Sequence, residues 1–212
     1  MNVDNQKEYW DKVAEIKTFT HPIDLELINI FLNKQSKIVD FGCGYGRIVK
    51  QLTDLGFENV SGFDTSKELI ARGISKNNLA LHHIDNPTEL LLEDNSIDCF
   101  ILFAVLTCIP SNKGQNDLIS LLFSKLKKGG VIYISDYYLQ ENSIEVERYE
   151  YFNGDKNNFG VFELPEGATF RHHTKEWIKT LINDFDILVE NPLIVKTMNG
   201  SIANGFQIIG KK

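Results

Sequence analysis

A glycine-rich segment links a short apolar run to a helical pattern, and it reads Val39-Asp-Phe-Gly-Cys-Gly-Tyr-Gly-Arg47. Residues 37–41 are typical of a buried strand, and apolar residues recur at helical spacing between Ile48 and Leu55. Glycine lets the backbone turn sharply and approach a ligand that a Cβ atom would keep away. A helix that begins near Gly46 also points its unpaired N–H groups into the same space. The segment therefore predicts a ligand site at the carboxyl end of the first strand.

The spacing of these glycines favours some ligands over others. The dinucleotide fingerprint G-x-G-x-x-G uses its third glycine for close packing of helix on strand. Arg47 occupies that position here, and the glycines follow G-x-G-x-G instead. The segment therefore disfavours NAD and FAD, and a nucleotide-dependent oxidoreductase is kept only as an alternative.

Strand and helix patterns alternate after this segment. Further strands are expected at residues 59–63, 79–84, 97–103 and 131–135. Helices are expected between them, one of which opens at the S/T-x-x-E capping box of residues 65–68. Such alternation predicts an α/β fold with a doubly wound parallel sheet that carries helices on both faces.

Polar residues stand where two of these strands end. Asp64 ends the second strand, and a carboxylate there can accept both hydroxyl hydrogens of a ribose. Its alternative role is at the start of the next helix, although Thr65 or Ser66 could cap that helix instead. Asp85 and Asn86 follow the third strand and could read an adenine amino group, or form a plain turn. Ligands of doubly wound sheets lie outside these strand ends, which favours a binding role.

Two regions surround the predicted sheet. Residues 1–33 carry two helical patterns, the second starting at Pro22, and are expected to form an N-terminal helical cap. Residues 137–173 form an insertion after the fifth strand that is polar, aromatic and irregular in pattern. A helix capped by Thr174 and two strands, near 185–190 and 205–210, complete the chain.

Length, charge and cysteine content limit the class of protein. The 212 residues fit a single domain, 1–212, and the net charge of −7 disfavours a nucleic-acid or anionic-membrane partner. The longest apolar run has eight residues, 99–106, where a bilayer span needs roughly 18. The three cysteines, Cys43, Cys99 and Cys108, form no C-x-x-C pair, so no metal site or disulfide is expected. Composition thus predicts a soluble, cytoplasmic protein without a metal.

Several segments together resemble the class I S-adenosylmethionine-dependent methyltransferases. The glycine segment is similar to the first motif of that family, and Asp64 matches its second-strand acidic residue. The segments 94–101, 104–110 and 126–131 resemble the stretches around its fourth and fifth strands. The resemblance implies a Rossmann-like seven-stranded sheet of order 3-2-1-4-5-7-6 with the last strand antiparallel, and S-adenosylmethionine as cofactor.

The same resemblance implies a set of cofactor-binding residues. Asp40 is expected to organise the glycine loop near the methionine amine, and the N-terminal helix is expected to fold over the cofactor. The full set is Tyr9, Trp10, Asp40, Gly42, Cys43, Gly44, Arg47, Asp64, Thr65, Ser66, Asp85, Asn86 and Ala104.

Departures from the family pattern bear on the substrate. The [D/N]-P-P-[Y/F] motif of methylases that act on base amines or glutamine is replaced by Phe103-Ala-Val-Leu106. Thr107-Cys108 stands where many relatives carry two histidines. Nucleic-acid methylation therefore loses its specific support, and a small-molecule acceptor is expected for a monomer or homodimer.

The acceptor site is expected over the carboxyl ends of the fourth and fifth strands. Asp136, Tyr137 and Arg171 are the candidate acceptor-binding residues, and His21, His172 and His173 are candidates for accepting a proton. Arg171 and the two neighbouring histidines could instead simply surround the start of the helix at Thr174. Rival functions are S-adenosylmethionine binding without catalysis and methylation of a protein or RNA.

Overall fold

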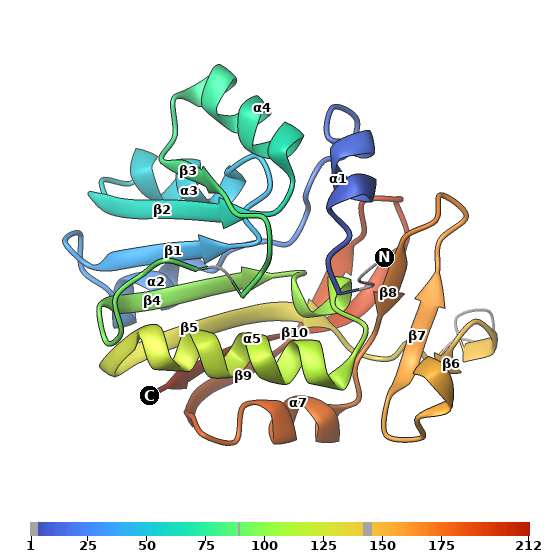
Figure 1. The fold of residues 1–212 in the computed structure, drawn as a ribbon. Coiled ribbons are helices and arrows are strands. Elements are labelled where there is room, and N and C mark those ends of the chain that lie inside the picture. Colours follow the sequence, from blue (N-terminus) through green and yellow to red (C-terminus); the bar gives the residue numbers. More distant parts are fainter. Residues whose placement is uncertain (1–3, 89, 142–145) are drawn as a thin grey trace.

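The computed structural model describes residues 4–88, 90–141 and 146–212. A seven-stranded sheet in the order β3-β2-β1-β4-β5-β10-β9 forms its centre (Figure 1). Strands β1 to β5 are parallel, and β10 runs antiparallel to both of its neighbours. The predicted fold class, strand order and reversed last strand are confirmed. The strands are β1 (Lys37–Phe41), β2 (Asn59–Asp64), β3 (Leu81–His83), β4 (Ile97–Phe103), β5 (Leu126–Tyr137), β9 (Asp186–Lys196) and β10 (Ile202–Lys211).

Helices cover both faces of the sheet because successive strand residues point to opposite sides. In β4, Phe100 and Leu102 join one core cluster and Cys99 and Ile101 join the other. The first cluster is closed by α5 (Asn112–Lys125) and α7 (Lys175–Leu181), and the second by α2 (Leu25–Phe31), α3 (Arg47–Asp54) and α4 (Lys67–Asn77). This double burial explains why β4 reads as a nearly continuous apolar run.

Two helices begin later than the sequence patterns predict. Ser66, and not Thr65, caps α4, because its hydroxyl accepts a hydrogen bond from the Leu69 amide. Asp24 caps α2, so this helix begins at Leu25 and not at Pro22. The predicted cap of α7 is confirmed, since the Thr174 side chain accepts from the Trp177 amide.

The insertion forms a second, small sheet where an irregular segment was expected. Its strands are β6 (Glu150–Tyr151), β7 (Phe159–Glu163) and β8 (Thr169–Arg171), which pair in antiparallel fashion. The small sheet stands beyond the arrowheads of the parallel strands, with α1 (Lys7–Val13) above this end (Figure 1). The sequence of the insertion does not show an apolar pattern typical of a strand, because Phe162 and Phe170 are buried by a distant segment. They pack with Tyr9 of α1. Residues 1–3 of the expected cap and 142–145 of the expected insertion lie outside the described residues.

Strands β9 and β10 form a hairpin that is longer than predicted. The sequence reading is interrupted by Pro192, which lies inside β9. Proline is tolerated there because β9 is the last strand of the sheet and one side of its backbone is unpaired. The extra length carries residues 197–201, the tip of the hairpin, to the carboxyl ends of the parallel strands.

Candidate active site

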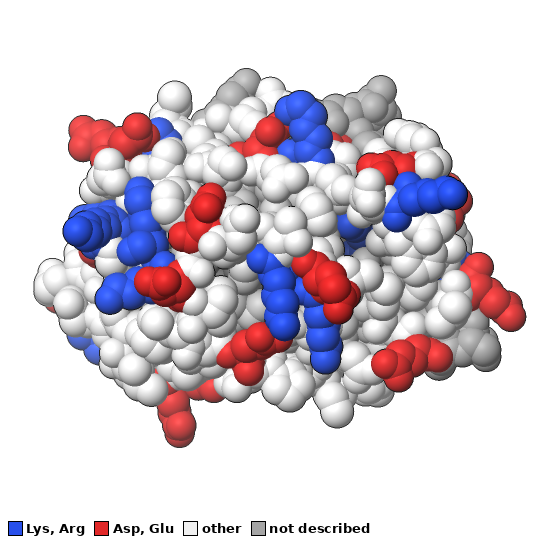
Figure 2. Space-filling model, turned by 90° about the horizontal axis from the view of Figure 1, so that it is seen from below, with Lys and Arg blue, Asp and Glu red and all other residues white. Residues whose placement is uncertain are grey.

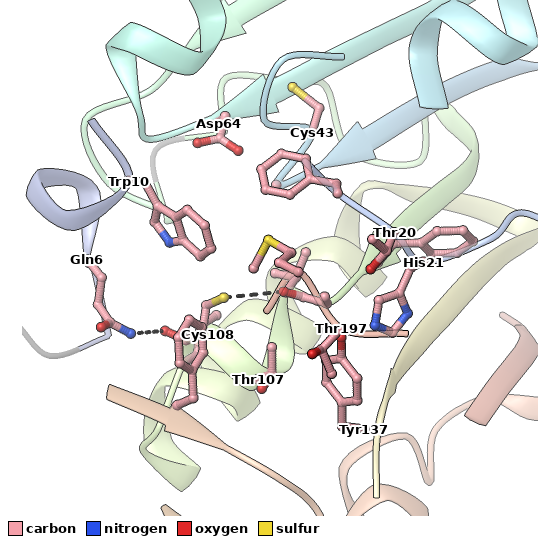
Figure 3. A pocket seen from close by; sticks show the side chains of 18 of the residues that line it. Gln6, Trp10, Thr20, His21, Cys43, Asp64, Thr107, Cys108, Tyr137 and Thr197 are labelled. Carbon is pink, nitrogen blue, oxygen red and sulfur yellow. Dashed lines mark hydrogen bonds between the residues drawn. The ribbon is translucent and has the colours of Figure 1, made fainter. Parts of the chain in front are cut away.

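A cavity of about 230 Å³ lies at the carboxyl ends of the parallel strands. Four parts of the chain line it: the N-terminal segment, the loops after β1 to β5, the insertion sheet and the β9–β10 hairpin tip. Figure 3 shows Trp10 of α1 and Asp64 of β2 pointing into this space from different elements. Segments that are far apart in the sequence therefore converge on one site.

The glycine loop after β1 requires its glycines. Gly42, Gly44 and Gly46 have φ angles of +72°, +54° and +77°, in the left-handed region that other residues rarely adopt. A Cβ atom on Gly42 would lie 2.6 Å from Val105 Cγ2, so the cavity wall also excludes a side chain there. The Gly42 amide donates to the Phe63 carbonyl oxygen at 2.8 Å, which ties the loop to the end of β2.

Asp64 is held by the same backbone. Its carboxylate accepts hydrogen bonds from the Gly44 amide at 2.7 Å and from the Ser66 amide at 2.8 Å. Burial raises the pKa of Asp64, and the two amide donors oppose that rise. The carboxylate is therefore fixed in orientation, and its residue still lines the cavity.

Asp40 and Arg47 line the cavity beside the loop. Burial raises the pKa of Asp40 to about 8, against the lowering effect of Arg47 and with a further rise from Asp64. Arg47 donates from Nη2 to the carbonyl oxygen of His21. Its buried Nε has no hydrogen-bond partner among the described residues, so one N–H donor is left unused.

His21 is a buried histidine with one ring nitrogen committed and one unused. Nδ1 lies 3.0 Å from Ser135 Oγ, and the ring meets Tyr137 edge-on with centroids 4.6 Å apart. Burial and then Arg47 lower the pKa of His21 to about 4, so the ring is neutral. Ser135 is fully buried, and among the described residues its hydroxyl has His21 Nδ1 as its hydrogen-bond partner. We assign the tautomer in which the hydroxyl donates to Nδ1 and Nε2 carries the ring hydrogen, because it leaves no buried hydroxyl hydrogen unpaired.

The three residues at the end of β8 separate onto two sides of the backbone, as successive residues of an extended chain do. His172 lines the cavity, with its Nδ1 2.6 Å from Tyr149 Oη. Burial, then Arg148, then His173 lower the pKa of His172 well below its ordinary value. His172 is therefore a neutral group in the cavity wall.

Arg171 and His173 point the other way, so the expectation that they reach an acceptor is corrected. Arg171 is 1% exposed and donates from Nη1 to Asn112 Oδ1 at 2.7 Å. His173 is fully buried, 3.0 Å from the Gln115 amide nitrogen and 3.1 Å from the Tyr137 carbonyl oxygen. Neither residue lines the cavity. Both instead join the insertion to α5 and β5.

Other expected site residues also lie outside the cavity lining. Tyr9 packs edge-on against Phe170, Ser66 caps α4, and Phe19 covers Gly44. Asp85 lies 3.7 Å from exposed Lys7, and Asn86 borders a separate hollow. The buried carboxylate of Asp136 accepts from the Thr107 and Tyr137 amides. The expected residues that do line the cavity are Trp10, His21, Asp40, Gly42, Cys43, Arg47, Asp64, Thr65, Ala104, Tyr137 and His172.

Several lining residues were not predicted from the sequence. Gln6 donates to the Cys108 carbonyl oxygen at 2.9 Å and accepts from the Thr169 amide at 2.7 Å, which pins the N-terminal segment to the insertion. Phe162 and the hairpin residues Thr197 to Ala203 form another wall. The Asn199-Gly200 pair is a turn signal in the sequence, but it does not indicate where the turn lies.

Ala104 is a strained element of the site. It follows β4 with a φ of +56°, which is uncommon for a residue other than glycine. Its amide donates to the Ser135 carbonyl oxygen at 2.8 Å, and this bond holds the chain in the turn. The backbone thereby enters the cavity wall directly after the strand.

Neither a metal-binding cluster nor a membrane-spanning helix occurs among the described residues. Over residues 4–88, 90–141 and 146–212, no group of three or more His, Cys, Asp or Glu side chains is placed to hold a metal ion. Within the same ranges, no helix combines the length and apolar character that crossing a bilayer requires.

Comparisons with known proteins agree with this geometry. A family model described as "Methyltransferase domain" matches residues 16–176. The ribosomal protein L11 methyltransferase of Shewanella pealeana is 31% identical over 147 residues, covering 66% of this chain and 48% of the relative. O-methyltransferase 3 of Dictyostelium discoideum is 33% identical over 179 residues, covering 73% of this chain and 39% of the relative. The chain thus spans about half the length, or less, of these curated relatives.

A solved structure extends the similarity to the whole fold. The SAM-dependent methyltransferase from Methanosarcina mazei matches with a TM-score of 0.78 and 26% identity, covering 88% of this chain and 96% of that chain. The chain therefore belongs to the Rossmann-like, S-adenosylmethionine-dependent methyltransferases. S-adenosylmethionine is the cofactor of this family.

Proposed function

We propose that this chain transfers a methyl group from S-adenosylmethionine to a small-molecule acceptor. The observation that carries the proposal is one cavity that contains both the glycine loop with Asp64 and a wall built by the insertion and the hairpin tip. The first part suits the cofactor, and the second offers room for an acceptor beside it.

Polar atoms with remaining hydrogen-bonding capacity in the cavity support the fit of the cofactor. Asp64 offers carboxylate oxygens to ribose hydroxyls, and Arg47 Nε offers a donor toward the methionine carboxylate. Asn5 lines the cavity, and its buried Oδ1 has no partner among the described residues, so it can accept from the adenine amino group. Asn5 thereby takes the role that the sequence predicts for Asp85 and Asn86. The backbone carbonyl oxygen of Asp85 instead accepts a hydrogen bond from Asn5 Nδ2 at 2.9 Å.

The protein contributes alignment and exclusion of water. When bound, the cofactor supplies an electrophilic methyl group on a sulfonium. Holding a nucleophile in line with such a group can supply roughly 7–11 kcal/mol of the barrier reduction. Trp10 and Phe19 of the N-terminal segment cover the loop side of the cavity, which keeps water from the reacting atoms.

The way the cavity is closed favours a small molecule over a polymer. Gln6 accepts from the Thr169 amide and so joins the N-terminal segment to the insertion, and Lys17 Nζ lies 2.8 Å from Asn199 Oδ1 of the hairpin tip. A protein or RNA acceptor would need this covering opened along its length. On the face shown in Figure 2, basic and acidic side chains alternate and form no continuous basic area. A protein acceptor, which the printed name of the Shewanella relative suggests for that protein, is the rival function.

Calorimetry with adenosylhomocysteine, S-adenosylmethionine and NAD tests the cofactor assignment. We expect both sulfur compounds to bind and NAD not to bind. Asp64→Asn should weaken adenosylhomocysteine binding by about 1.5–3 kcal/mol, the scale of hydrogen bonds to a charged group. Asp54→Asn is the control, because Asp54 pairs with Lys50 on the exposed side of α3. Equal affinities in the two variants would overturn the role of Asp64.

Product analysis then separates catalysis from binding alone. Incubating the protein with methyl-labelled S-adenosylmethionine and a pool of metabolites should give a labelled small product, detected by mass spectrometry. Label recovered only in protein or RNA would replace the proposed acceptor class, and cofactor binding without any labelled product would favour a binding protein.

A further inference from the structure

The cavity wall on the side away from the glycine loop contains many apolar side chains. We call one wall of the cavity the acceptor side. It is formed by Tyr137, Gln140, Arg148, the insertion strands β7 and β8 with His172, and the hairpin residues Thr197 to Ala203. Five of its side chains are large and apolar: Phe162, Leu164, Phe170, Met198 and Ile202. Such walls suit a molecule with a flat or hydrocarbon body of ligand size.

The charges of the cavity are divided between its two sides. Three described carboxylates line it, those of Asp4, Asp40 and Asp64. Asp40 and Asp64 belong to the glycine-loop side, and the Asp4 carboxylate accepts from the Ser111 amide at 3.0 Å. No described carboxylate belongs to the acceptor side, where Arg148 lies 3.8 Å above the Phe162 ring. A protonated amine would therefore be desolvated there without an opposite charge, which is costly.

Unused polar atoms on this side can donate hydrogen bonds. His21 Nε2 and Thr197 Oγ1 are buried, line the cavity and have no partner among the described residues. Figure 3 shows His21, Thr197 and Tyr137 gathered at one end of the cavity. The hydroxyl hydrogen of Thr197 and the Nε2 hydrogen of His21 need an acceptor atom. An oxygen on the bound molecule meets that need.

A base for removing a proton is missing from the described acceptor side. His21 and His172 are neutral and weakly basic because burial lowers the pKa of each. Asp136 lies behind the wall, fully buried, with its carboxylate bonded to two backbone amides. An acceptor that is already ionised needs no base.

We propose, resting on the proposed function above, that the acceptor is a small apolar or aromatic molecule whose nucleophile is an ionised oxygen, a carboxylate or phenolate. The oxygen lone pair forms the O–CH₃ bond while the S–CH₃ bond breaks, and the bonding electrons pass to sulfur. The sulfonium and the oxyanion become a neutral thioether and a neutral ester or ether, with no proton to remove. Because opposite charges cancel along this path, a low-dielectric cavity favours it over water.

Three probes with the same ring system test the charge preference. The protein is first saturated with adenosylhomocysteine, which is followed separately by calorimetry. 2-Naphthoate, 2-naphthol and 2-naphthylmethylamine are then titrated by ligand-observed NMR. We expect the naphthoate anion to bind at least tenfold more tightly than the ammonium compound, with the naphthol between them.

A pair of matched variants tests the assigned donors. Thr197→Val removes a hydroxyl that has no partner among the described residues, so the fold should be unaffected, and naphthoate affinity should fall at least fivefold. Thr180→Val, on the exposed side of α7, should leave it unchanged. Tighter or equal binding of the ammonium probe, or no binding of any probe, with adenosylhomocysteine bound would overturn this inference alone. Failure of adenosylhomocysteine to bind the unaltered protein would overturn the proposed function and the inference with it.

Discussion

Arg171 and His172 are adjacent in the sequence, but they serve different parts of the molecule. The Arg171 guanidinium donates to the Asn112 side chain and lies 5.0 Å from the Trp177 ring centroid, in the interface of β8 with α5 and α7. His172 faces the cavity on the other side of the backbone. One residue holds the insertion in place, and its neighbour shapes the ligand site.

Substituting Arg171 should therefore reduce stability more than ligand binding. Arg171→Ala leaves the Asn112 oxygen and the Pro110 carbonyl oxygen without this donor and opens a cavity, so we expect a loss of about 2–4 kcal/mol in the free energy of unfolding. Urea denaturation measures this loss, and adenosylhomocysteine affinity should stay within twofold. Lys179→Ala on the exposed side of α7 is the control. A stable variant that had lost methyl transfer would return Arg171 to the acceptor site.

Single residues could be predicted from the sequence where local geometry decides their role. Gly42, Gly46 and Asp64 have positions set by a strand end and the turn that follows, and all three keep those positions in the structure. His173 could not be placed in this way, because its partners Gln115 and Tyr137 come from elements distant in the sequence.

At the scale of secondary-structure elements, the N-terminal segment and the hairpin tip contact each other at the cavity. Lys17 Nζ lies 2.8 Å from Asn199 Oδ1 and 3.9 Å from the Glu166 carboxylate. Gln6 joins the same segment to the insertion by accepting from the Thr169 amide. Asp11 joins it to α4 by accepting from the Ser66 hydroxyl at 2.7 Å. We call the two contacts of Lys17 a latch, and we expect them to break when ligands enter or leave the cavity.

Weakening this latch should speed release of the cofactor product. An exposed polar pair contributes about 0.2–1 kcal/mol, so Lys17→Ala should raise the adenosylhomocysteine dissociation rate by about two- to fivefold. Stopped-flow fluorescence of Trp10 reports the release, and Lys12→Ala on the exposed side of α1 serves as the matched control. Identical rates in both variants would show that another contact governs opening.

Hydrogen exchange tests the same segment without a substitution. Residues 4–20 should exchange more slowly once adenosylhomocysteine is bound, because closure over a ligand orders such covers. The protection of β4, which is buried on both faces, provides the internal reference. Equal protection of the segment in both states would contradict a moving cover.

Strands and helices could be predicted from the sequence where the spacing of apolar residues alone specifies them. The apolar run of β4 and the helical spacing in α3 are sufficient, since the sheet buries both of their apolar faces. The insertion sheet could not be predicted, because Phe162 and Phe170 are core residues only when α1 is packed on them. Pro192 concealed the full length of β9 for a similar reason, since its tolerance depends on the strand being at an edge.

At the scale of the whole molecule, buried histidines make stability depend on pH. Burial lowers the pKa of His173 to about 3, while the unfolded chain has an ordinary histidine pKa near 6.5. The unfolded chain therefore binds more protons below pH 6.5, and stability falls as the pH drops toward 3. Asp40, whose pKa burial raises to about 8, acts in the opposite direction between about pH 4 and 8.

Substituting one histidine isolates its part of this dependence. His173→Gln should lower stability at every pH, because packing and hydrogen bonds are lost, but the loss between pH 7 and pH 5 should shrink by about 2 kcal/mol relative to the unaltered protein. Urea denaturation at the two pH values measures the difference. Thr180→Val, in an exposed position of α7 and without a titratable group, is the control. An unchanged difference in His173→Gln would mean that this ring binds its proton equally well in the folded and the unfolded protein.

The two borders of the large sheet have a consequence for self-association. Strand β3 spans three residues, and β9 carries Pro192, which has no amide hydrogen to offer a neighbouring chain. A strand of a second copy could form few backbone hydrogen bonds with β3, because β3 is short. Pairing with β9 would be interrupted at Pro192. A very short border strand and a proline in the opposite border strand are two features that limit strand-by-strand polymerisation of a sheet.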